Sequence, residues 1–208
     1  VYQIPQAGRA AKGKAVVNLI NIGKDERITA VLAVRDFVEK SYVFMATRRG
    51  VVKKTELLAY SNPRVGGIIA LTLDEGDELI DVHLTDGERN VFLGTKHGHS
   101  IRFKETDVRV MGRTARGVTG IRMATDDLVV GMEILSGGNS ILTVSEKGFG
   151  KRTDVAEYRL QSRGGKGIIN LRTTPRVGPV TRVLQVGLLQ ELHIVGELLA
   201  LELHTVED

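Results

Sequence analysis

The chain has 208 residues, with 29 lysines and arginines against 25 aspartates and glutamates, a formal net charge of +4 at pH 7. Its 42% hydrophobic residues are typical of a soluble globular chain, and because no apolar run approaches the roughly 18 residues of a membrane span, we exclude a membrane protein. The absence of cysteine excludes disulfides, thiolate nucleophiles and zinc ribbons, and favours a cytoplasmic protein. Since the chain begins at Val1 without a secretory leader, we expect a fragment of a longer protein.

A repeat of about 50 residues organises the chain. Four similar segments each end in a glycine, and these glycines are spaced by 54, 50 and 50 residues: Gly13, Gly67, Gly117 and Gly167. Turn glycines followed by apolar and basic residues recur with spacings of 48 and 50 residues: Gly50, Gly98 and Gly148. Two independent markers therefore share one period.

Between these markers, short apolar runs bounded by turn residues predict strands. In chain order they are residues 15–20, Ile28–Val34, Tyr42–Thr47, Val51–Thr55, Ile68–Leu73, Leu79–Leu84, Asn90–Thr95, Ser100–Lys104, Gly117–Arg122, Leu128–Ile134, Ser140–Ser145, Phe149–Thr153 and Ile168–Arg172. Four strands per repeat is the size of a propeller blade, and the runs are too short for a helical solenoid. We therefore predict an all-β fold of about four four-stranded blades around an axis, in a closed ring or an open spiral.

The whole chain, residues 1–208, is assigned to one domain. Residues 1–20 are predicted to end an upstream blade, and residues 21–73, 74–122 and 123–172 to form three further blades. Residues 173–208 are expected to form a divergent last blade or an acidic end, because Val183–Asp208 contains five acidic residues and no lysine or arginine. Within it, Leu188–Leu203 has a partly helical pattern.

Cations recur at matching positions of the repeats. Three of the four glycine-ended segments carry a basic residue both four and one positions before the glycine, the second has Arg64 instead, and further cations follow each turn glycine. Because equivalent loops of neighbouring blades lie side by side, they predict a basic track on the rim that fits duplex DNA, and the scarcity of aromatic residues argues against a single-strand platform. The predicted DNA-binding residues are Arg9, Lys12, Lys53, Lys54, Arg64, Arg102, Lys104, Arg113, Arg116, Lys151, Arg152, Arg163 and Lys166.

Other patterns give weaker support to catalysis or metal binding. Acidic pairs precede the first strand of each unit, and we interpret them as solvated turn residues rather than metal ligands or catalytic carboxylates: Asp25-Glu26, Asp77-Glu78 and Asp126-Asp127. His97 and His99 flank a turn without a third metal ligand at a recognisable spacing. Tyr60 and Tyr158 have an apolar counterpart at Val108, which indicates packing. We therefore predict no catalytic residue and no metal. The alternative is a protein-interaction propeller that recognises an acidic partner or an adjoining subunit.

A seven-residue motif resembles the box of the C-terminal domain of gyrase A, the DNA-cleaving chain of bacterial DNA gyrase, a type IIA topoisomerase: Gln161, Ser162, Arg163, Gly164, Gly165, Lys166 and Gly167. Other stretches look like the same domain, including Val43–Thr47, Val52–Thr55, Asp74–Ile80, Arg102–Glu105, Arg113–Arg122 and Gly150–Tyr158, so that the resemblance covers roughly residues 1–186. In that family the essential box usually lies in the first blade, which on this alignment falls upstream of Val1.

The resemblance implies a β-pinwheel, a propeller-like disc in which neighbouring blades exchange strands. It implies a non-catalytic module that binds and wraps duplex DNA around its rim and so lets gyrase add negative supercoils. The implied partners are double-stranded DNA and the gyrase core, formed by the N-terminal region of gyrase A together with gyrase B. The catalytic tyrosine lies in that N-terminal region, and ATP and Mg act through other domains, so no cofactor is expected in this chain. The equivalent domain of topoisomerase IV is the alternative within the family.

Overall fold

The computed structural model describes residues 8–13, 27–64, 67–136 and 140–187, which contain three β-sheets. The first has the strand order β3-β1-β2-β6, with bounds Leu79–Thr85, Tyr42–Thr47, Val51–Glu56 and Val118–Thr119. The second has the order β10-β5-β4-β7, with β11 also paired to β5, and bounds Leu160–Gln161, His99–Lys104, Asn90–Thr95, Val129–Leu135 and, for β11, Ile168–Ile169. The third has the order β12-β8-β9, with bounds Val180–Val186, Ser140–Ser145 and Gly150–Asp154.

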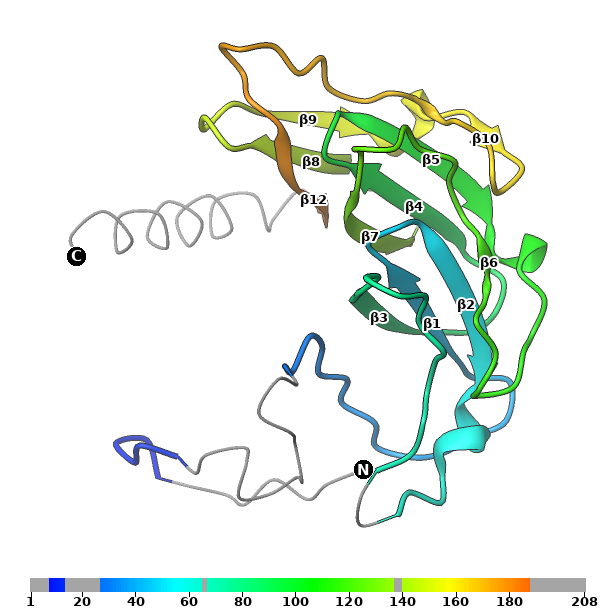
Figure 1. The fold of residues 1–208 in the computed structure, drawn as a ribbon. Helices are drawn as coiled ribbons and strands as arrows, with labels where there is room; N and C mark the ends of the chain where they lie inside the picture. Colours follow the sequence, from blue (N-terminus) through cyan, green and yellow to red (C-terminus); the bar gives the residue numbers. More distant parts are fainter. Residues whose placement is uncertain (1–7, 14–26, 65–66, 137–139, 188–208) are drawn as a thin grey trace.

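The sheets follow one another around an arc, with β3, β7 and β12 toward its inner side and β2, β5 and β9 toward its outer side (Figure 1). Short 3-10 helices follow the outer strands: η2 (Leu57–Tyr60), η3 (Glu105–Asp107) and η4 (Val155–Glu157). This all-β, propeller-like arrangement confirms the predicted fold class. Among the described residues, no helix is long and apolar enough to span a membrane.

Each sheet takes strands from consecutive repeats. The hairpin β1-β2 is completed on its inner side by β3 and on its outer side by β6, both of which come from the next repeat. The hairpin β4-β5 is completed in the same way by β7 and β11. Because an uncovered strand presents unpaired N–H and C=O groups, this exchange protects both edges of a hairpin and ties consecutive sheets together.

The two faces of a sheet pack in different hydrophobic clusters. On β4, Val91 and Leu93 belong to the cluster of Phe44 and Ile101, whereas Phe92 packs with Tyr158 in the next cluster, with the ring centroids 4.9 Å apart. Since side chains alternate between the faces of a strand, β4 is buried between its two neighbouring sheets. The buried position of Tyr158 confirms the prediction that this residue serves packing.

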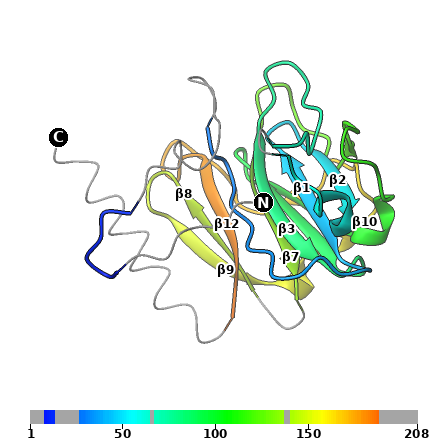
Figure 2. The ribbon, with the colours of Figure 1, turned by 90° about the horizontal axis from the view of Figure 1, so that it is seen from below.

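The strand predictions are confirmed for the hairpins and wrong for two connecting runs. Asn90–Thr95 and Ser140–Ser145 have the predicted bounds, whereas Ile28–Val34 and Ile68–Leu73 form no strand in the described chain. Their counterparts in the next repeat are β3 and β6, which pair with the β1–β2 hairpin. The equivalent hairpin for Ile28–Val34 and Ile68–Leu73 would come before residue 27, where predicted strand 15–20 lies outside the described residues. Segment 27–40 passes beside β3 without joining a sheet (Figure 2).

Two further predicted strands are shorter than expected. Gly117–Arg122 and Ile168–Arg172 each contain a two-residue strand, β6 and β11. In the second case the chain bends over the β4–β5 turn, because the Gly98 carbonyl accepts the N–H groups of Asn170 (2.8 Å) and Leu171 (3.0 Å). At the carboxyl end, β12 was not predicted, and the helical pattern of Leu188–Leu203 lies outside the described residues.

Candidate nucleic-acid interface

The loops that carry the predicted cations cross from one sheet to the outer strand of the preceding sheet. After η3, Val110 pairs in parallel with Lys54 of β2, the chain turns through residues 112–117, and it returns as β6 antiparallel to β2. On β5, β10 and β11 repeat this pattern of parallel and then antiparallel pairing. We call residues 112–117 and 162–167 the box loops. Each box loop therefore lies at a joint between consecutive sheets.

The glycines that close the box loops are required by close backbone contact. Gly117 and Gly167 have φ values of +104° and +74°, in the left-handed region that favours glycine. A Cβ atom on Gly117 would lie 2.6 Å from the Val52 carbonyl oxygen, and one on Gly167 would lie 2.3 Å from that of Ser100. The repeat signal in the sequence therefore arises from a chain laid directly on the outer strand.

The structure corrects the prediction for Lys53 and Lys54, which are 0% and 5% exposed. The Lys53 ammonium donates to the carbonyls of Ala70, at 2.7 Å, and Arg113. Burial, aided by the Arg113 charge, lowers the pKa of Lys53 to about 8. Lys54 donates to the Glu105 carbonyl at 3.2 Å, and its ammonium lies 5.4 Å from the centroid of the Tyr42 ring. Both lysines join consecutive repeats internally, so neither belongs to an exposed cationic surface.

Three predicted arginines are partly buried and bond across joints. Arg113 donates to the Ile69 carbonyl at 3.2 Å, and Arg163 donates to the Thr119 carbonyl at 3.2 Å, in each case 44 residues upstream. A second bond runs from Arg163 Nε to the Asp107 carbonyl at 2.9 Å. The equal sequence separation identifies one contact repeated at two joints, which holds the box loop to the preceding repeat.

The third of these arginines, Arg102, lies four residues after a turn glycine. Arg102 donates to the carbonyl of Val155, the first residue of η4, at 3.0 Å. It also donates to the Tyr158 carbonyl at 3.2 Å. Lys54, four residues after the preceding turn glycine, makes the equivalent contact with Glu105, the first residue of η3. These positions therefore serve the joints.

The remaining predicted cations are exposed: Arg9, Lys12, Arg64, Lys104, Arg116, Lys151, Arg152 and Lys166. Arg116 forms a two-point ion pair with Asp74, one bond of which runs from Nε to Oδ1 at 2.6 Å. This hydrogen bond lowers the pKa of the Asp74 carboxyl. The box loops thus present one cation engaged by a carboxylate, Arg116, and one at the equivalent position, Lys166, that lines a cavity.

Several exposed cations were missed by the sequence analysis although they share the 50-residue period. Arg109 and Arg159 precede the two box loops, and Arg122 and Arg172 follow them. The prediction covers basic residues within the four positions before each segment-ending glycine and those that follow the turn glycines, and these arginines lie at other places in the repeat. Searching every basic residue for a partner 50 positions away finds both pairs.

Two acidic residues that were interpreted as solvated turn residues have a different role. Asp77 and Asp127 are 8% and 5% exposed. The Oδ1 atom of Asp77 accepts the N–H groups of Arg49 and Glu78, and that of Asp127 accepts those of His97 and Leu128, at 2.8 to 2.9 Å. Each carboxylate therefore ties the start of an inner strand to the hairpin turn of the preceding repeat. This corrects the prediction for these two residues. Within the described ranges, no group of three or more His, Asp or Glu side chains could hold a metal ion.

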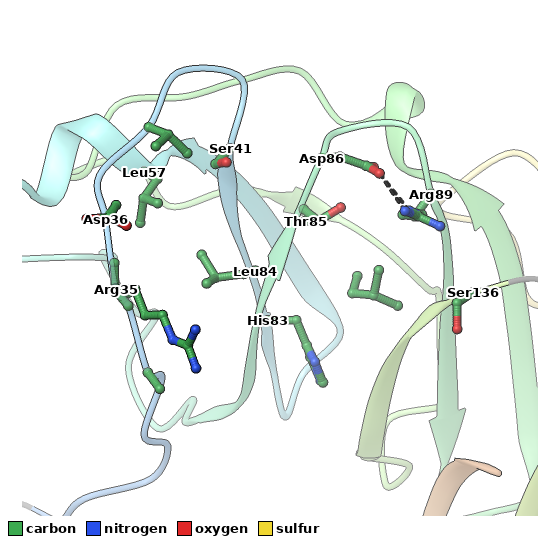
Figure 3. A pocket seen from close by; sticks show the side chains of 14 residues that line it. Arg35, Asp36, Ser41, Leu57, His83, Leu84, Thr85, Asp86, Arg89 and Ser136 are labelled. Atoms are coloured by element: carbon green, nitrogen blue, oxygen red, sulfur yellow. Dashed lines mark hydrogen bonds and ion pairs between the residues drawn. The ribbon is translucent and has the colours of Figure 1, made fainter. Parts of the chain in front are cut away.

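A wide pocket of about 790 Å³ lies between segment 33–41 and β3. Figure 3 shows Arg35 and Asp36 on one side and His83 and Leu84 on the other. Arg89 is held by Asp86 through a contact of 2.8 Å. Because this pocket combines both signs of charge with apolar side chains, it does not extend the cationic surface of the box loops.

Comparison with known families agrees with this architecture. The model of the DNA gyrase C-terminal domain, beta-propeller, matches residues 1–35, 41–86, 89–136 and 139–186. The chain belongs to this family. Three of the four matched segments contain one hairpin together with the inner strand that follows it in the sheet: β1 to β3, β4 to β7 and β8 to β12.

The curated relatives are gyrase A chains. The chain is 50% identical over 186 residues to DNA gyrase A of Salmonella typhimurium, covering 89% of this chain and 21% of the relative. It is 48% identical to the Escherichia coli protein with the same coverage, and 44% identical to that of Haloquadratum walsbyi, covering 94% of this chain and 24% of the relative. The chain thus spans about a fifth of the length of the first of these relatives.

Solved structures of this gyrase family and of topoisomerase IV share the fold. The C-terminal domain of DNA topoisomerase IV superposes with a TM-score of 0.79 at 30% identity, covering 84% of this chain and 55% of that one. A DNA gyrase A C-terminal domain superposes with a TM-score of 0.76 at 25% identity, covering 85% and 59%. The fold is therefore common to both enzymes, while the family model and the curated relatives place this chain with gyrase A.

Proposed function

We propose that this chain binds duplex DNA along the exposed cations of its box loops and wraps it, as the non-catalytic module with which DNA gyrase introduces negative supercoils. The observation that carries the proposal is the repetition of exposed cations at successive joints. Arg116 and Lys166 occupy equivalent places 50 residues apart, and Arg109 and Arg159 do the same beside them. Membership of the gyrase C-terminal family supports the assignment.

The physical basis is the charge of the duplex. DNA carries one phosphate charge per roughly 1.7 Å of axis, so a row of cations along a curved surface supplies affinity through phosphate contacts alone. Such binding favours sequences that bend easily, because the deformation energy depends on the sequence being bent. The arc of sheets provides a curved surface, and the box loops recur along it (Figure 1).

In this proposal the chain acts with the rest of gyrase. Its partners are double-stranded DNA and the enzyme core, formed by the N-terminal region of gyrase A together with gyrase B. The chain itself holds no cofactor and carries out no chemical step, and ATP and Mg are used by other parts of the enzyme.

A ligation assay tests wrapping. Nicked circular DNA is incubated with the purified chain, sealed with ligase, freed of protein and compared with a protein-free control. We expect a positive linking-number shift that increases with protein concentration, because chiral wrapping is trapped when the circle closes. Binding without a shift would refute wrapping by these repeats, and absence of duplex binding would favour a protein-interaction propeller.

A matched pair of variants tests the interface. Lys104→Gln combined with Lys166→Gln removes two exposed cations, and we expect the slope of log affinity against log salt to fall by about 1.8, at about 0.9 per phosphate contact. Arg182→Gln removes an exposed cation from β12, an inner strand, and serves as the control with an unchanged slope. Equal slopes for wild type and the double variant would exclude these lysines from the interface.

A further inference from the structure

A cavity of about 340 Å³ lies beside the second box loop, with Ile121 and Met123 among its lining residues. The β4–β5 turn contributes His97 and His99, the segment after β6 contributes Arg122, and the second box loop contributes Lys166. Three stretches of chain that are distant in sequence therefore bring four basic side chains to one cavity.

The backbone around this cavity is held by bonds that the preceding joint repeats. Arg122 N–H donates to the Gly165 carbonyl at 2.9 Å, and fifty residues earlier Thr72 N–H approaches the Ala115 carbonyl at 3.4 Å. The two joints can therefore be compared position by position, with Lys166 corresponding to Arg116.

The turns that precede β7 and β3 contain the pair of equivalent positions that differs between the two joints. Asp127 N–H donates to the Ala124 carbonyl at 3.2 Å, and Asp77 N–H donates to the Asp74 carbonyl at 3.0 Å. Ala124 thus stands where Asp74 stands in the preceding joint. A carboxylate in one joint is replaced by a methyl group in the other.

This replacement changes the electrostatics of the joint. Asp74 binds the box cation of its own joint, Arg116, through two contacts. Among the described residues, Lys166 has no hydrogen bond or ion pair to take the place of that carboxylate. The first joint therefore contains its own anion, and the second contains the cations without it.

The acidic groups near the cavity leave this imbalance in place. Asp127 lines the cavity but is 5% exposed and uses Oδ1 to accept two backbone N–H groups. Asp126 lies 3.7 Å from Nε2 of His97, with 80% of its side chain exposed to solvent that screens the contact. Within the described part of the chain, neither carboxylate lies within ion-pair distance of Arg122 or Lys166.

We propose that this cavity binds a phosphate-type oxyanion, in the place that the Asp74 carboxylate takes in the preceding joint. A tetrahedral oxyanion offers several acceptor oxygens to the guanidinium, ammonium and imidazole donors carried by four of the residues that line the cavity. The inference rests on the proposed function, because a backbone phosphate of wrapped DNA is one source of this group, with free phosphate as the other.

The first experiment titrates the wild-type chain with inorganic phosphate and follows the amide signals of Arg122, Gly165 and Lys166 by NMR. We expect saturable shifts at these residues. Ala124→Asp restores the internal carboxylate and should weaken phosphate binding about tenfold, whereas Ala124→Asn adds the same bulk without charge and should change it by less than about twofold. Equal phosphate affinity in the two variants, or no saturable shift in the wild type, would overturn the proposal.

The reciprocal variant tests the comparison between the joints. Asp74→Ala removes the internal carboxylate from the first joint, and we expect phosphate to shift the amide of Arg116, which should be unresponsive in the wild type. If phosphate does not shift the Arg116 amide in Asp74→Ala, a box cation without its carboxylate is not enough to bind phosphate, and the inference loses its basis. If Ala124→Asp proves unfolded by its NMR spectrum, Lys166→Gln supplies the same test at the exposed lysine.

Duplex binding distinguishes the two sources of the oxyanion. A salt slope about 0.9 lower for Ala124→Asp than for Ala124→Asn identifies a backbone phosphate, since one contact is lost. Equal slopes together with lost inorganic phosphate binding identify free phosphate as the ligand. Failure of the wild type to bind any duplex refutes the proposed function, whereas the phosphate titration continues to test the cavity.

Discussion

Substitution of the two cations in the second box loop should affect different properties: the stability of the fold for Arg163, and the salt dependence of duplex affinity for Lys166. Arg163 is partly buried and donates to two backbone carbonyls, of Asp107 at 2.9 Å and Thr119 at 3.2 Å. Lys166 is exposed at the cavity. Arg163→Lys keeps the charge but should keep only one of the two contacts, because they are made by different guanidinium nitrogens, Nε and Nη1, and the compact ammonium of lysine does not reproduce that fork. Lys166→Gln removes the charge and leaves the joint intact.

The expected magnitudes follow from these contacts. A hydrogen bond from a charged donor contributes about 1.5 kcal/mol at the low end, which suits a partly exposed guanidinium, so Arg163→Lys should lower the free energy of unfolding by about 1.5 kcal/mol. For a domain of this size that corresponds to a decrease in Tm of about 4 °C. Lys166→Gln, as a surface change, should stay within about 0.5 kcal/mol of wild type.

Thermal unfolding and the salt dependence of duplex affinity measure the two effects on the same proteins. Arg163→Lys should lose stability with an unchanged salt slope, and Lys166→Gln should lose about 0.9 of slope with unchanged stability. Arg113→Lys is a further control, because Arg113 has one carbonyl contact of this kind, to Ile69, and should lose less stability. A reduced slope in Arg163→Lys, or an unchanged Tm, would refute the assignment of this arginine to the joint.

Four further substitutions test two titratable side chains and two turn glycines. Burial raises the pKa of Glu133 to about 7, so the folded state holds this proton more tightly than the unfolded state, and stability is lost as pH rises from about 4.5 through 7. Urea unfolding at pH 5 and 8 measures this loss, and it should be about 2 kcal/mol smaller in Glu133→Gln than in the wild type. Lys53, with its lowered pKa, has the opposite sign. The stability of wild type relative to Lys53→Met should therefore rise by about 2 kcal/mol between pH 7 and 10, and a constant difference would contradict the burial argument. Gly167→Ala should lower the free energy of unfolding by about 3 kcal/mol, because its Cβ would approach the Ser100 carbonyl oxygen to 2.3 Å. Gly148 also has a positive φ but no neighbour within 4 Å of a Cβ, so Gly148→Ala should cost about 1 kcal/mol. Chemical denaturation measures both values.

Sequence patterns predicted the hairpins because their signals are local. Asn90–Thr95 is an apolar run that ends just before a turn glycine, and both features are contained within about ten residues of the pairing they predict. The 50-residue period also fixes the sheet as the repeating unit. The exchange of strands between repeats was expected from the family resemblance and not from these local patterns, because β3 and β6 have the pattern of ordinary strands of their own unit.

The burial of cations was not accessible to the same reasoning. Lys53 and Lys54 follow two valines in β2, and nothing near them in sequence indicates that their outer edge is covered. The cover comes from residues about 60 positions later, where Val110 and the Arg113 carbonyl reach β2. Asp77 was interpreted as solvated for the same reason, because its partner Arg49 lies 28 residues upstream in a turn. Long-range partners decide burial, and the local pattern does not contain them.

The periodic cations therefore divide into two groups with different physical roles. Residues four positions before a box glycine, Arg113 and Arg163, donate to carbonyls of the preceding repeat and set how one sheet sits against the next. Residues one position before it, Arg116 and Lys166, are exposed on the loop that those contacts hold. In the proposed wrapping, the first group determines the curvature of the path. Within the second group Lys166 supplies a contact along it, because Arg116 is engaged by Asp74. A substitution in the first group that preserves charge should therefore alter the linking-number shift per bound protein while leaving duplex affinity and its salt slope unchanged, which separates the path of the DNA from the strength of its binding.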